Sequence, residues 1–187
     1  IFDKNSGAYL RTINNPSPGP EEYFGYGLGM LGDTVIAGAR GDDADGLDAG
    51  LVYLFNGHTG ALLRTLHNPS PTGQDNFGYS VVGFADNKIA VAAPGTDYKA
   101  VNSGAVHIFN ADTGALLHSI YAPQPVTEGN FGFQVRARGD DIIVGAPGQQ
   151  KAYLFDGETG ELKLRFNHPQ PQIGGAMGST VGAVGHH

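Results

Sequence analysis

The sequence contains no cysteine and no tryptophan, and it is poor in basic residues. Without cysteine the chain can form no disulfide, thiol nucleophile or thiolate metal site. Only 11 lysines and arginines stand against 18 aspartates and glutamates, so the formal net charge is −7. Nucleic-acid binding needs a basic face, and we therefore expect none. No apolar run approaches the roughly 18 residues of a membrane-spanning helix, so we expect no membrane insertion.

Residues that form turns are abundant. Glycine contributes 30 of the 187 residues and proline 11, and both are spread along the whole chain. Hydrophobic residues still make up 40%, which is too apolar for a disordered chain. No stretch shows sustained helical periodicity. The composition predicts a turn-rich, all-β fold.

Three sequence markers recur in the same order along the chain. In each set the copies are separated by 53, 54 and 46 residues. The markers are a Phe-Gly or Met-Gly pair beginning at Phe24, Phe77, Phe131 and Met177, a Ser/Thr-Gly turn ending at Gly7, Gly60, Gly114 and Gly160, and a proline-rich link at Pro16, Pro69, Pro123 and Pro169. Internal repeats of this length are typical of β-propeller blades.

Each repeat contains four short segments with strand character. In the second repeat they are residues 77–84, 88–93, 105–110 and 115–121, separated by Gly, Asp, Asn or Pro. Segments 89–94 and 142–147 are apolar nearly throughout, which is expected of strands covered on both faces. Four antiparallel strands per repeat predict propeller blades that pack face to face.

The repeats divide the chain into three full blades with partial blades at both ends. The predicted division is 1–23 for the end of a preceding blade, 24–76, 77–130 and 131–176 for the full blades, and 177–187 for the first strand of a further blade. The chain begins at Ile1 without an initiator methionine or signal peptide. We therefore interpret it as a fragment of a larger propeller; the alternative is that copies associate through open blade edges to close a ring.

The repeat text resembles the FG-GAP repeat over essentially the whole chain. The Phe-Gly pairs and Val144-Gly145-Ala146-Pro147 carry the likeness, whereas segments 92–94 and 38–40 keep only part of the Gly-Ala-Pro motif. That repeat builds the propeller of integrin α subunits and of many bacterial surface and secreted proteins. The resemblance implies an extracellular or cell-surface, secreted protein of the bacterial branch.

An acidic loop in the first repeat is the candidate metal site. Its carboxylates are Asp42, Asp43, Asp45 and Asp48. Calcium prefers hard oxygen ligands in such loops, and no other cofactor is expected. The similar integrin-type loop places acids at relative positions one, three, five and nine. Asp43 and Asp45 match two of these, but Gly41 and Ala49 occupy the other two. The alternative is a solvated loop in which aspartate serves turn chemistry.

Other short motifs carry less information. Residues 40–42 and 138–140 both spell Arg-Gly-Asp, the tripeptide that integrins recognise, and we interpret both as turn chemistry. Residues 27–32 match a dinucleotide fingerprint by letter. That motif needs a following helix, whereas a strand is predicted at 34–39, so we reject it. The Thr-Gly turns are also similar to those of quinoprotein dehydrogenase propellers, but those use tryptophan to dock their blades. We assign blade docking instead to Phe24, Phe77, Phe131, Phe55, Phe109 and Phe155.

The sequence contains no Gly-x-Ser-x-Gly and no His-Glu-x-x-His motif. The preferred hypothesis is a non-catalytic extracellular module that binds a protein or glycan, supports adhesion, or acts as a surface scaffold. Binding would use loops at one rim, including the acidic loop near Asp43. One alternative is the substrate-positioning propeller of a secreted hydrolase or lyase. Another is a structural protein that associates with itself.

Overall fold

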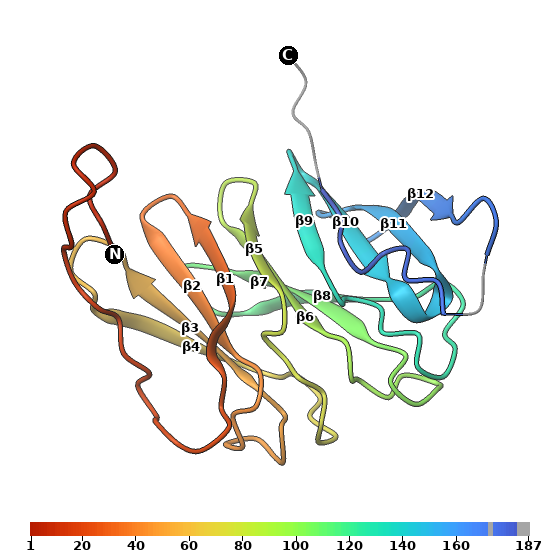
Figure 1. Ribbon diagram of the computed structural model, residues 1–187, viewed down its shortest axis with the longest axis horizontal. Helices are drawn as coiled ribbons and strands as arrows, with labels where there is room; N and C mark the ends of the chain where they lie inside the picture. Colours follow the sequence, from red (N-terminus) through yellow and green to blue (C-terminus); the bar gives the residue numbers. More distant parts are fainter. Residues whose placement is uncertain (172–173, 183–187) are drawn as a thin grey trace.

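The fold consists of three four-stranded antiparallel sheets, each a simple meander in chain order. A computed structural model describes residues 1–171 and 174–182 (Figure 1). The first sheet comprises β1 (Phe24–Leu31), β2 (Thr34–Ala39), β3 (Leu51–Asn56) and β4 (Leu62–His67). The second comprises β5 (Val81–Phe84), β6 (Lys88–Ala93), β7 (Ala105–Asn110) and β8 (Leu116–Tyr121). The third comprises β9 (Val135–Arg138), β10 (Asp141–Ala146), β11 (Lys151–Asp156) and β12 (Leu162–Asn167).

The sheets stand side by side like blades, and the fold is all-β as predicted. Their first strands, β1, β5 and β9, lie next to one another, and the later strands of each sheet extend away from them (Figure 1). One 3-10 turn, η1 (Pro147–Gln149), is the only helical element among the described residues. The three blades form an open fan and do not close a ring. In the part of the chain that the structure describes, no helix has the length and apolar character to cross a membrane.

Apolar residues cover both faces of the second sheet. On β6, Ile89 and Val91 pack in a cluster with the first sheet, whereas Ala90 and Ala92 pack in a cluster with the third. Alternate residues of a strand point to opposite faces, so a strand between two blades must be apolar at every position. This confirms the interpretation of the apolar segment 89–94.

The Phe-Gly pairs anchor each blade to its own third strand. Phe77 packs edge-on against Phe109 with ring centroids 5.8 Å apart, and Phe131 packs against Phe155 in the same way at 5.7 Å. Phe77 and Phe131 are fully buried in the two clusters between sheets. Their predicted role in blade docking is confirmed. In the first blade, Phe24 and Phe55 pack together at 6.1 Å in a third cluster, and Phe24 is only half-buried.

Neighbouring blades are also joined through their backbones. The N–H groups of Asn76 and Phe77 donate to the carbonyls of Asp48 and Ala49 in the loop of the preceding blade. Gly50 ends that loop with φ +84°, and a Cβ there would lie 2.1 Å from the Phe77 carbonyl oxygen. Only glycine combines that positive φ with so close an approach. The Phe-Gly turn of one blade is thus fitted to the loop of the blade before it.

Strand bounds in the second repeat were largely predictable. Strands β6 and β7 coincide with the predicted segments 88–93 and 105–110, and β8 starts one residue late. The predicted strand at 77–84 was too long, because β5 begins only at Val81. Gly78 has φ +89°, so the chain turns at the Phe-Gly pair before it enters the sheet.

The two ends of the chain contain less strand than the sequence suggested. Residues 1–23 form one isolated bridge, between Phe2 and Tyr9. The described residues 174–182 contain no strand, and positions 183–187 lie outside the described residues. Gly178 nevertheless occupies the Phe-Gly position, because its carbonyl oxygen would be 1.9 Å from a Cβ on Gly145. A strand needs a partner for its ladder, and neither end has a complete neighbouring sheet.

Candidate functional site

The acidic loop folds with one of its four aspartates inside the protein. The Asp42 side chain is buried, and its two carboxylate oxygens accept hydrogen bonds from the Tyr53 hydroxyl and the Ala44 N–H, each at 3.0 Å. Burial and the neighbouring Asp42 charge raise the pKa of Tyr53. Asp42 therefore serves as an internal acceptor that ties the loop to β3.

Two of the other three carboxylates have separate partners. Asp43 Oδ1 accepts from the Asp48 N–H at 2.7 Å, and Asp45 lies 2.8 Å from His67 Nδ1. The second blade repeats the first of these bonds, since Asp97 Oδ1 accepts from the Asn102 N–H at 2.8 Å. Loop architecture thus accounts for an aspartate at this position in both blades.

The carboxylates do not converge on one point. Among residues 1–171 and 174–182, no three acidic or histidine side chains gather as metal ligands. In this conformation the donor set does not fit a four-carboxylate calcium site. The assignment of calcium to Asp42, Asp43, Asp45 and Asp48 stays a prediction, and its test is given in the Discussion.

The first Arg-Gly-Asp tripeptide is held by contacts within the protein. Asp42 is buried as described, and the guanidinium of Arg40 lies 4.1 Å from the ring centroid of Tyr23 and 4.5 Å from that of Tyr26. Arg40 also donates to Asn76 Oδ1 at 2.8 Å. The second tripeptide forms the turn between β9 and β10, where Gly139 has φ +59°. Both have structural roles, which agrees with their interpretation as turn chemistry.

The dinucleotide fingerprint at residues 27–32 is excluded by its surroundings. These residues lie on β1 and in the turn after it, and the next element is β2. No helix N-terminus follows to hold a pyrophosphate. Its rejection from the sequence is confirmed.

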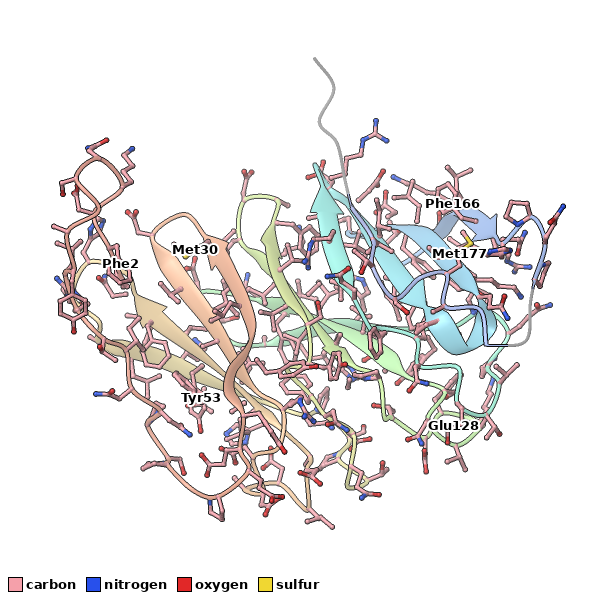
Figure 2. The ribbon with its side chains drawn as sticks, viewed as in Figure 1. Phe2, Met30, Tyr53, Glu128, Phe166 and Met177 are labelled. Carbon is pink, nitrogen blue, oxygen red and sulfur yellow. The ribbon has the colours of Figure 1, made fainter. Side chains whose placement is uncertain are left out.

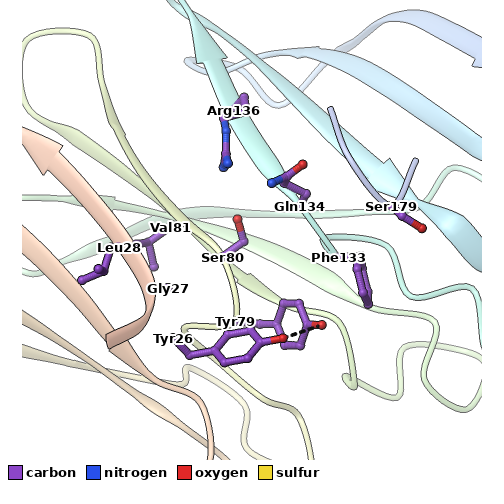
Figure 3. A pocket seen from close by; sticks show the side chains of 10 residues that line it. All are labelled: Tyr26, Gly27, Leu28, Tyr79, Ser80, Val81, Phe133, Gln134, Arg136 and Ser179. Carbon is purple, nitrogen blue, oxygen red and sulfur yellow. Dashed lines mark hydrogen bonds between the residues drawn. The ribbon is translucent and has the colours of Figure 1, made fainter. Parts of the chain in front are cut away.

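A row of three aromatic rings lies where the blades enter their first strands. Tyr26 and Tyr79 have ring centroids 4.8 Å apart, and Phe133 follows 5.0 Å from Tyr79. The Tyr26 hydroxyl donates to the Tyr79 hydroxyl at 3.1 Å (Figure 3). Burial is the main cause that raises the pKa of Tyr79, and this hydrogen bond raises it further. We call these three residues the aromatic row.

The aromatic row borders a hollow of about 430 Å³. Ten residues line it: Tyr26, Gly27, Leu28, Tyr79, Ser80, Val81, Phe133, Gln134, Arg136 and Ser179 (Figure 3). The hollow therefore combines flat apolar rings with hydroxyl, amide and guanidinium groups, which is the composition typical of ligand sites.

Two polar side chains in the lining also join neighbouring blades. The Val135 N–H donates to Ser80 Oγ at 3.1 Å, and the Val181 N–H donates to Gln134 Oε1 at 2.7 Å. Ser80 and Gln134 hold the same position in successive repeats. These bonds link each of the two segments to the next repeat along the border of the hollow.

Sequence reasoning missed the aromatic row, although a signal was present. The residue after each Phe-Gly pair is aromatic in all three full blades, at Tyr26, Tyr79 and Phe133. An aromatic side chain at one repeat position can equally belong to the core. Only the arrangement of blades shows that these three rings gather at one surface.

These features identify the class of protein as a propeller-type module built from repeated four-stranded blades. Residues 18–55, which hold β1, β2 and most of β3, match the family model of the FG-GAP repeat. That segment is thus similar to an FG-GAP repeat, and the second and third blades have the same four-stranded topology as the first.

Other comparisons extend the fold assignment only. No curated protein sequence matches the chain. Among solved structures, the crystal structure of the computationally designed Ika8 protein, in crystal packing No.1 in P63, is similar. The TM-score is 0.51 at 20% sequence identity, and the match covers 84% of this chain. This chain spans only 44% of the length of that one, and at this identity the likeness shows the fold alone.

Proposed function

We propose that this chain is a non-catalytic binding module that acts outside the cell or at the cell surface, in a bacterium, and holds a saccharide chain along the aromatic row. The aromatic row of Tyr26, Tyr79 and Phe133 is the observation that carries the proposal. The FG-GAP repeat at residues 18–55 supports the extracellular setting.

A saccharide suits both parts of the hollow. The C–H face of a pyranose ring packs on an aromatic face, while its hydroxyls form hydrogen bonds with groups at the ring edge. The row extends over three successive rings, which suits an extended ligand better than a single small ring. Protein ligands commonly place a large anchor side chain in a well-packed pocket, whereas the rings here pack against one another and border an open hollow.

The chemistry of the lining supports binding without reaction. Glycoside hydrolysis uses a pair of carboxyl groups on either side of the scissile bond. The described residues that line the hollow present rings, hydroxyls, an amide and a guanidinium, and no carboxyl pair of this kind is among them.

Equilibrium binding to an oligosaccharide panel tests the proposal. Tyr26→Ala and Phe133→Ala should each weaken saccharide binding by about three- to tenfold, because each removes one stacking face. Tyr9→Ala is the matched control, since Tyr9 is also exposed but lies on the N-terminal segment, outside the hollow.

Two results would count against the proposal. The binding function is wrong if the wild type binds no saccharide, or if Tyr9→Ala weakens binding as much as Tyr26→Ala does. If chromatography shows that the bound oligosaccharide is cleaved, a role in a hydrolase or lyase is favoured instead.

A further inference from the structure

The geometry points to an acidic saccharide as the ligand of the aromatic row, with the Arg136 guanidinium pairing with a sugar carboxylate. This inference rests on the proposed function and deepens it. Its starting point is the charge of the hollow. Among the ten described residues that line the hollow, Arg136 alone carries a charge. The chain as a whole has a net charge of −7, so a cationic hollow stands apart from the rest of the protein.

Arg136 is placed to receive an anion. It lies on β9, exposed, and one of its terminal nitrogens donates to the Val135 carbonyl at 2.8 Å. A guanidinium has five N–H donors in a planar fork, so further donors remain for a ligand. A carboxylate accepts two parallel N–H bonds from such a fork, and this pairing is stronger than a bond between neutral groups.

The fold itself does not require an arginine at this position. The equivalent residues in the two preceding repeats are Gly29 and Val82, neither of which is charged. All three blades nevertheless have the same four-stranded topology. The positive charge at Arg136 is thus specific to the blade that borders the polar side of the hollow.

A second cation lies near the other end of the aromatic row. Arg40 lies over the Tyr26 ring and is 5.8 Å from the Tyr79 ring centroid. Its bond to Asn76 holds it in place. Arg40 itself does not line the hollow, so Arg136 is the cation that the described lining presents to a ligand. A saccharide that brings a carboxylate to Arg136 while its ring packs on the aromatic row is complementary to this arrangement.

A matched pair of ligands isolates the charge. An oligouronate and its fully methyl-esterified form share one backbone and differ in the charge of their carboxyl groups. We expect the full chain to bind the acid form at least about tenfold more tightly than the ester, and added salt to reduce this preference.

Two variants locate the source of the preference. Arg136→Gln should bring the affinities for acid and ester together, while ester binding changes little. Arg138→Gln, on the same strand but outside the hollow, should keep the preference. Near-ultraviolet circular dichroism of both variants verifies that the fold is intact.

The outcomes separate this inference from the proposed function. Equal affinity of the wild type for acid and ester, or an unchanged preference in Arg136→Gln, overturns the acidic ligand and leaves saccharide binding standing. Binding of neither form, with capture of an acidic peptide instead, overturns both. Loss of the preference in Arg136→Gln alone supports the inference.

Discussion

At the scale of single residues, the third strand of each blade carries a polar side chain at one buried position. Tyr53, His107 and Tyr153 occupy this position, opposite Ala37, Val91 and Val144 in the ladders. The two tyrosines donate to a nearby side chain, Tyr53 to Asp42 and Tyr153 to Gln149 at 2.5 Å. The first and third blades thus satisfy the position in the same way.

The second blade differs at both members of this pair. Thr96 stands at the repeat position of Asp42, and His107 replaces the tyrosine. His107 Nδ1 lies 2.8 Å from Ser119 Oγ, but Thr96 Oγ1 and His107 Nε2 have no hydrogen-bond partner among the described residues. A buried polar atom without a hydrogen-bond partner lowers the free energy of unfolding. We therefore expect these two atoms to make the second blade less stable.

Acid should destabilise the protein through His107. Burial lowers the pKa of His107 from 6.5 to about 4. The unfolded chain therefore takes up this proton at a higher pH than the folded protein does. The stability that neutral His107 contributes is present above pH 6.5 and is lost as the pH falls to about 4, by up to ~3 kcal/mol.

Urea denaturation at a series of pH values measures this effect. The double variant Thr96→Asp/His107→Tyr copies the first blade, and we expect it to lose this part of the pH dependence. An identical pH profile in wild type and double variant would show that His107 is not responsible.

At the scale of elements, the loop between the second and third strands of a blade receives the Phe-Gly turn of the next blade. The loops of the first two blades share the Asp-to-backbone bond at Asp43 and Asp97, and both end in a glycine of positive φ. The first loop has more acidic residues than this architecture needs. Those additional carboxylates are what the calcium prediction depends on.

Calorimetric titration with calcium tests that prediction. If the first loop binds calcium, the wild type should give a heat of binding, and Asp43→Ala should abolish it. Asp97→Ala breaks the equivalent backbone bond in the second loop and should retain the heat, which separates loss of a ligand from loss of loop structure. If wild type and Asp43→Ala behave alike, with no heat, the calcium assignment is wrong.

At the scale of the whole molecule, the outer face of the third blade has no further sheet packed on it among the described residues. Phe166 on β12 is 42% exposed, whereas the equivalent Leu66 and Ile120 are 2% and 4% exposed against the next sheet. Phe2, at the opposite end of the molecule, is also largely exposed (Figure 2). Exposed apolar surface on a sheet face favours association.

We expect the chain to associate with itself through this face at high concentration. Phe166→Ser, alone or with Leu164→Ser, should shift the population toward the 19.5 kDa monomer in sedimentation equilibrium. Leu63→Ser is the control, because Leu63 is as exposed as Leu164 but lies on β4 of the first blade. A wild type that stays monomeric at every concentration would contradict self-association.

The sequence by itself determined the repeat, the all-β fold and most strand bounds of the second repeat. Each of these depends on local patterns: Phe-Gly pairs at regular intervals, glycine at turns, and apolar runs such as 89–94. The role of Phe77 and Phe131 in blade docking followed from the same periodicity, because a large aromatic side chain at every copy of a repeat needs a common place in the core.

Tertiary structure alone decided which side chains meet. Tyr26, Tyr79 and Phe133 are separated by whole repeats in the chain and come together only because the first strands of successive blades lie side by side. Conversely, Asp42 and Asp45 are close in sequence, yet one turns inward to Tyr53 and the other pairs with His67. Sequence distance fixes neither the packing of blades nor the direction of a loop side chain, since both depend on contacts between distant segments.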